Sequence, residues 1–273
     1  MTFRAIICAL VVLFVSPALG QKSKVVKRSA EKAEKLRVKG YKQAKRHRYK
    51  KALPLLEEAL QLMRYPDSEL MYDLGSISEA LNNCPKAILY YTGFLSSMPD
   101  EKERTEVTEK LKRCMKSSEL GTVDVTSQPE GLEVRLNGVP MGRAPLRGLK
   151  LPTGIYTVTS DKEDFHPYKS TLSVEYNLRS RHDVRLKKKI FYGTLEVKVT
   201  PNDGAVVFLN HIKQGPSPFT SKKLETKRYL VHIEKEGWDR WVRYVTVVKD
   251  STFTVDVKLE KTNTKVPIPP IPE

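Results

Sequence analysis

The sequence contains few of the residues and motifs on which enzyme chemistry depends. Its five histidines are scattered along the chain, and none has a partner at the spacing of metal ligands. No glycine-rich phosphate loop follows a predicted strand, and the motif Gly-x-Ser-x-Gly does not occur. We therefore predict that the chain is not an enzyme and that it has no catalytic residue, no cofactor site and no metal site.

Long hydrophobic runs are also scarce. Arg4 precedes one apolar stretch from Ala5 to Val15, and the small residues Ala18 and Gly20 follow it. About 11 apolar residues are too few to cross a bilayer, which needs roughly 20. We expect a signal peptide over residues 1–20, cleaved before Gln21, rather than a membrane anchor. We expect no transmembrane segment in the mature chain, which we place in the periplasm or at the cell envelope.

Cysteine is rare, and two cysteines, Cys84 and Cys114, lie beyond the predicted leader. An even pair in an exported protein favours a disulfide. The two residues are expected at neighbouring ends of antiparallel helices, which also favours the bond. The other interpretation is two buried free thiols. A zinc site would need further ligands at suitable spacing.

Acidic residues are in the minority, and the net charge is +16. Fourteen lysines and arginines stand between Gln21 and Lys51, against Glu31 and Glu34. Such a segment attracts acidic glycans, anionic membrane surfaces or acidic proteins. Nucleic acid is a weaker candidate because export removes the chain from it. The other interpretation is a solvated helix face preceded by a basic arm over residues 21–29.

About 250 residues remain after the leader, enough for two or three small domains with separate cores. From about Ala30 apolar residues recur at three- and four-residue steps, which predicts helices. Gly40 and Gly75 are 35 residues apart, as are Ala52 and Ala87. This spacing resembles the tetratricopeptide repeat, and we assign residues 30–118 to such a domain. The resemblance implies a concave protein-binding face, with the candidates Arg37, Tyr41, Lys45, Tyr72, Ser76 and Glu79.

The C-terminal half contains a pattern that occurs twice, offset by 72 to 73 positions. Residues 121–125 (Gly-Thr-Val-Asp-Val) are echoed by residues 193–197 (Gly-Thr-Leu-Glu-Val). Apolar and polar residues alternate between turn-forming Pro, Gly and Asn residues in both copies. About seven short strands in 70 residues predict a compact sandwich of two sheets.

The two copies resemble PEGA domains. The name-giving turn corresponds to residues 129–132 (Pro-Glu-Gly-Leu) and, less faithfully, to residues 201–205 (Pro-Asn-Asp-Gly-Ala). A later Gly-x-x-Pro also matches at residues 142–145 and 215–218. We place the domains at residues 121–188 and 192–260, before a Pro-rich tail over residues 261–273. The expected fold class is α+β multidomain: an antiparallel helical repeat followed by two small all-β domains.

Aromatic side chains in the β domains have two interpretations. Phe165, Tyr168, Trp238 and Trp241 are candidates for contact with a glycan surface, although aromatic residues more often fill a core. The resemblances imply a bacterial envelope protein without transferable catalytic residues. We predict an exported scaffold or adaptor that binds envelope proteins through its helices, with the β domains as spacer or docking surface. The alternative is a protein that binds acidic glycan or another anionic surface.

Overall fold

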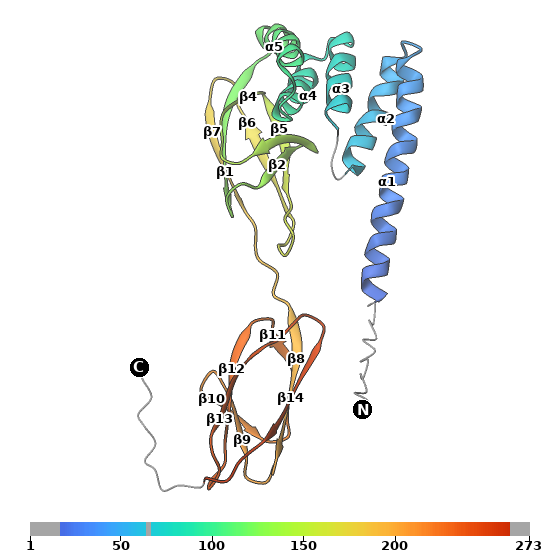
Figure 1. The fold of residues 1–273 in the computed structure, drawn as a ribbon. Coiled ribbons are helices and arrows are strands. Elements are labelled where there is room, and N and C mark those ends of the chain that lie inside the picture. The colour runs from blue at the N-terminus through green and yellow to red at the C-terminus, as the bar shows by residue number, and fades with distance from the viewer. Residues whose placement is uncertain (1–16, 64–66, 263–273) are drawn as a thin grey trace, which may run out of the picture. The chain divides into compact units, whose positions relative to one another are not determined.

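The computed structural model describes residues 17–63 and 67–262, with side chains from Lys27 onward (Figure 1). The chain divides into two compact units, Met1–Lys187 and Lys188–Glu273, which are described separately below. Within residues 17–63 and 67–187 the first unit contains five helices and seven strands, and the second contains seven strands within residues 188–262. The α+β class predicted from the sequence is confirmed. Within the described residues, none of the helices has both the length and the apolar character that a membrane-spanning helix needs.

The helices form antiparallel hairpins that pack side by side (Figure 1). Their bounds are α1 (Pro17–Ala44), α2 (Tyr49–Leu62), α3 (Ser68–Ala80), α4 (Cys84–Ser96) and α5 (Glu101–Lys116). Gly40 lies against Leu56 of α2, and Gly75 lies against the ring of Tyr91 on α4. Any side chain at either glycine would clash, so both glycines set the close approach within a hairpin, as their spacing predicted.

Helix α1 begins earlier than the apolar periodicity indicated. It starts at Pro17 instead of near Ala30, so the segment expected as a basic arm over residues 21–29 is helical. The sequence from Gln21 to Lys39 contains no Pro or Gly, and its Lys, Glu, Ala and Arg residues have high helix propensity. The intrinsic helix propensity of these residues therefore extends α1 toward the N-terminus, into a segment that has no apolar stripe.

The first β module is a sandwich of two sheets. Its strands are β1 (Leu120–Gln128), β2 (Glu133–Leu136), β3 (Val139–Arg143), β4 (Leu146–Pro152), β5 (Gly154–Ser160), β6 (Tyr168–Val174) and β7 (Arg179–Arg185). One sheet has the order β4-β1-β7 and the other β3-β2-β5-β6. Strands β1 and β7 pair in parallel, whereas the other pairs are antiparallel.

The second module repeats this topology strand for strand. Its strands are β8 (Tyr192–Thr200), β9 (Val206–Leu209), β10 (Ile212–Pro216), β11 (Phe219–Glu225), β12 (Arg228–Glu234), β13 (Trp241–Thr246) and β14 (Thr252–Lys258). The sheet orders are β11-β8-β14 and β10-β9-β12-β13, with β8 and β14 parallel. The predicted seven-stranded sandwich is confirmed in both copies. A matching pair of tyrosines, Tyr156 and Tyr229, donates to the carbonyl oxygens of Pro152 and Glu225.

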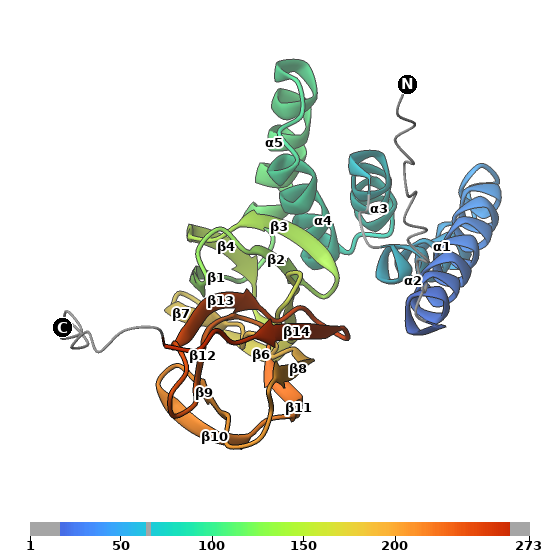
Figure 2. The same cartoon turned by 60° about the horizontal axis from the view of Figure 1, so that its bottom comes forward.

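The helices and the first β module share one hydrophobic core, whereas the second module has a core of its own. Separate cores were expected for every domain, and that expectation was wrong for the first unit. Helix α4 lies directly on β3 and β4 (Figure 2). Gly93 makes this possible, because a Cβ atom there would collide with Val139 and would crowd the Pro140 carbonyl and Met71. The Ser96 hydroxyl also donates to the Pro140 carbonyl oxygen at 3.2 Å.

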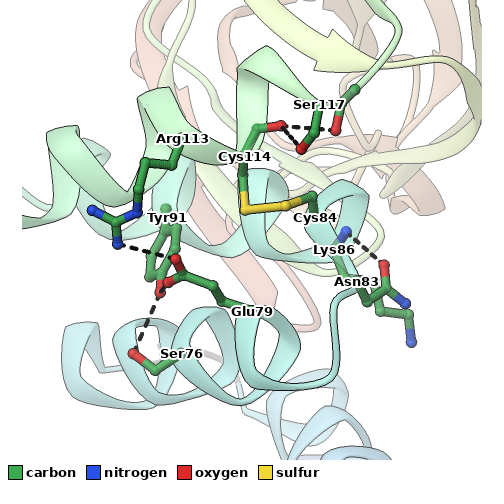
Figure 3. Close-up of a disulfide and its surroundings, with 10 residues drawn as sticks. Ser76, Glu79, Asn83, Cys84, Lys86, Tyr91, Arg113, Cys114 and Ser117 are labelled. Carbon is green, nitrogen blue, oxygen red and sulfur yellow. Dashed lines mark hydrogen bonds and ion pairs between the residues drawn. A yellow bond between two sulfur atoms is a disulfide. The ribbon is translucent and has the colours of Figure 1, made fainter.

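A disulfide joins Cys84 at the start of α4 to Cys114 near the end of α5 (Figure 3). The two Cα atoms are 4.9 Å apart, and the sequence separation is 30 residues. Asn83, beside the bond, caps α4 by accepting a hydrogen bond from the Lys86 amide. The disulfide therefore fixes α5 against α4, the helix that contacts the β module.

The substitution Gly93→Val tests the contact between α4 and β3. Because a side chain must displace the helix from the strand, we expect the free energy of unfolding of the first unit to fall by about 1–3 kcal/mol. Urea unfolding followed by circular dichroism measures the change. Lys102→Val, at an exposed position of α5, places the same side chain on a helix without the clash and should change stability much less.

The double substitution of Cys84 and Cys114 to serine tests the disulfide. Closing a loop of this length should stabilise the fold by about 3 kcal/mol in the chain-entropy model, so the variant should unfold at lower urea concentration. A reductant should lower the stability of the natural chain by a similar amount and leave the variant unchanged. Equal stability of oxidised protein and variant would contradict the expectation.

Candidate functional site

The structure separates the six candidate residues of the helical domain into different surroundings. Arg37 on α1 bonds to the Asp67 carboxylate at 2.6 Å and lies 3.2 Å from Glu34. Its guanidinium is 5.9 Å from the centre of the Tyr41 ring. Asp67 also caps α3 by accepting from the Leu70 amide. Arg37 therefore ties α1 to the start of α3.

Tyr41 and Ser76 line the same small cavity between α1, α2 and α3, with a volume of about 240 Å³. The Tyr41 hydroxyl faces the Asp73 carboxylate, which also lines this cavity. Burial raises the pKa of the Asp73 carboxyl group. The pKa of Tyr41 is also raised, mainly by burial and to a smaller extent by the charge of Asp73. Asp73 has no ion-pair partner among the described side chains. The cavity thus presents a half-buried carboxylate without a cation.

Tyr72 and Glu79 face α5 instead. Tyr72 donates to Glu106 at 2.7 Å and accepts from Lys110 at 2.7 Å. Glu79 binds Arg113 at 3.0 Å and lies beside the disulfide (Figure 3). These contacts attach α5 to α3, so both side chains already have partners within the chain.

Lys45, the sixth candidate, is exposed at the end of α1. It belongs to a series of exposed basic residues along this helix: Lys27, Arg28, Lys32, Lys35, Lys39 and Lys42. Lys32 pairs with Glu58 at 2.7 Å, and the rest of the series has no ion pair within the described part of the chain. The positive charge predicted for this segment therefore faces solvent.

The aromatic candidates of the β modules are half-buried. Tyr168 packs on the first core and donates to the Asp183 carbonyl oxygen at 3.2 Å. Trp238 and Trp241 pack on the second core. Phe165 lies in a turn with the Lys162 ammonium 5.6 Å from its ring centre. Three of the four candidates thus contribute to cores, in line with the more common role of such residues.

The structure brings together side chains that are distant in sequence. His211 and His232 have ring centres 5.5 Å apart, and His232 stacks on Phe208 at 4.4 Å. Burial is the main cause that lowers the pKa of His232. The histidines are scattered in the sequence, and the fold brings these two together because the turn after β9, which contains His211, lies near β12, which contains His232. Within residues 17–63 and 67–262, no three His, Cys, Asp or Glu side chains are arranged to hold a metal ion.

The fold defines a class of protein with a helical domain and two β-sandwich modules of identical topology in tandem. The family model of the PEGA domain matches residues 120–191 and 192–263, which together exceed half of the chain. The chain therefore belongs to the PEGA domain family. The two matched segments coincide with β1–β7 and β8–β14.

Among solved structures, the chain is similar to one titled "The Bacillus anthracis TIE protein". The identity is 13% and the TM-score is 0.34, and the match covers 52% of this chain and 34% of that one. The alignment thus spans about a third of that protein's chain. Comparison with curated protein sequences gave no match.

The substitution Asp73→Asn tests whether this carboxylate has a structural role. Since Asp73 has no ion pair among the described residues, we expect the free energy of unfolding at pH 7 to change by no more than about 1 kcal/mol. A raised carboxyl pKa means that the folded state binds the proton more tightly. The natural chain should therefore gain stability relative to the variant as the pH falls toward that pKa.

Urea midpoints of both proteins between neutral and acidic pH measure this difference. A loss of more than about 2 kcal/mol at neutral pH would instead show that the carboxylate holds the helices together.

Proposed function

We propose that this protein is a non-enzymatic, exported adaptor of the cell envelope that binds a protein partner through its helical domain. The observation that carries the proposal is the cavity lined by Tyr41, Asp73 and Ser76. It lies where two helical hairpins meet, and its carboxylate has no ion-pair partner among the described side chains. Partners of solenoid-like helical arrays bind across such repeated hairpins.

Three further features support the proposal. The hairpins repeat with Gly40 and Gly75 at equivalent contacts, as in tetratricopeptide-like repeats. The apolar stretch after Arg4 has the composition of a signal peptide, which agrees with a periplasmic or envelope location. The two β modules repeat one topology in tandem, which suits a role as spacer or docking surface.

A second candidate function is binding to acidic glycan or to an anionic membrane surface. The exposed basic residues of α1, most of them without an ion pair among the described residues, favour it. Binding of this kind depends on long-range charge attraction and is screened by salt. Nucleic acid is not a proposed partner.

Co-sedimentation of the mature protein with isolated envelope material tests the proposal. We expect binding that survives high salt and disappears when the envelope material is first digested with protease, because a packed protein interface depends little on screening. A variant that fills the cavity, Ser76→Phe, should bind less. The matched control Thr105→Phe places the same ring on an exposed face of α5 and should bind normally.

Binding that survives digestion and falls steeply with salt would contradict the adaptor and support the second candidate. If the Ser76→Phe variant also binds envelope material that has been digested with protease, recognition lies outside the helical cavity.

A further inference from the structure

A groove of about 630 Å³ lies between the end of α4 and strand β3, inside the first unit. Buried Met71 and Met141 form its floor. Leu95, Pro140 and Leu146 also line it. None of these residues was a candidate from the sequence, because the groove exists only where the helical domain meets the β module.

The rim of the groove carries an exposed methionine. Met98 follows α4, has a positive φ of 57° and is 84% exposed. Met98 lines the groove together with Leu95 and Leu146, and a contiguous apolar surface of this kind marks a binding site more often than a single exposed apolar side chain does. Three methionines in one groove also give it an adaptable lining, because the unbranched thioether chain fits side chains of different shapes.

Arg143 gives the groove a charged side. Its side chain is exposed, and within the described residues it makes one long hydrogen bond, 3.5 Å to the Gly131 carbonyl oxygen, and no ion pair. Glu133 also lines the groove, and its carboxylate is bound to Arg135 at 2.9 Å. A guanidinium that has no ion pair among the described residues and lies beside an apolar groove is complementary to a carboxylate attached to an apolar group.

The second module provides an internal comparison. Val139, Met141 and Arg143 correspond to Ile212, Gln214 and Pro216, at a constant offset of 73 positions. Strand β10 is exposed at Ile212, Lys213 and Gln214. The apolar floor and the guanidinium therefore occur only in the first of the two modules, which packs on the helices. The fold of the module does not by itself require these residues.

We propose that this groove binds an extended segment of a partner protein in which an apolar side chain is followed by an acidic one. The apolar side chain enters between Met71, Met98 and Met141, and the carboxylate pairs with Arg143. The net charge of +16 favours the approach of acidic segments. This surface is distinct from the cavity at Tyr41, so the chain would contact partners at two places.

Methyl NMR of the mature chain labelled at methionine tests the proposal directly. The probes are a short blocked peptide in which phenylalanine is followed by glutamate and the same peptide with glutamine. We expect the glutamate peptide to shift the methyl signals of Met71, Met98 and Met141, and to bind about five-fold more tightly than the glutamine peptide. Met63 and Met115 do not line the groove and should keep their positions.

Two variants separate the contributions. Arg143→Gln should abolish the preference for glutamate, whereas Arg147→Gln, an exposed arginine four positions away, should retain it. Met98→Ala removes an exposed side chain and should weaken both peptides without affecting folding.

The absence of shifts at millimolar peptide, or equal shifts at Met63 and Met115, would overturn the proposal. An unchanged glutamate preference in Arg143→Gln would overturn the carboxylate contact. Shifts of the groove methionines that depend on protein concentration without peptide would show that a second copy of the chain occupies the groove, and would overturn the peptide as its occupant.

Discussion

The architecture of the first unit depends on one close contact, that of α4 with β3 at Gly93. Because this residue has no Cβ atom, the helix approaches the strand so closely that a Cβ atom there would collide with Val139. The contact merges the helical core with the core of the β module. It also leaves the groove lined by Met71 and Met141 at its edge, so this groove and the junction between the helices and the β module have a common origin.

Much of the fold follows from patterns in the sequence. The offset of 72 to 73 positions predicts two equivalent modules, and alternation of residues such as Val123 and Val125 predicts their half-buried strands. The alternation of apolar and polar residues does not predict which strands pair with each other in the sheet. The parallel pairing of β1 with β7 joins the first and last strands of a module, and no local signal marks it. The shared core was not predicted for a similar reason, since nothing in the sequence around Val139 and Met141 marks a contact with a helix.

The candidate sites show the same limit. Spacing in the helical segment identified Tyr41 and Ser76, which do lie together, but it also grouped them with Tyr72, which faces α5. Helical periodicity predicts which residues share one face of a helix. It does not predict which other element packs on that face. Asp73 and Arg143 carry no motif at all. Each becomes notable only when the structure shows a charged group beside a cavity without a partner of opposite charge among the described residues.

The parallel pairing of terminal strands has a mechanical consequence. In each module the first and last strands run side by side in the same direction, as Thr122–Gln128 with Arg179–Arg185 and Thr194–Thr200 with Thr252–Lys258. The chain therefore enters a module at one end of this pair and leaves it at the other. Tension along the chain loads all the hydrogen bonds between the two strands together, in shear, so that they do not open one at a time. A module built in this way resists extension, which suits a spacer that has to hold its length under load.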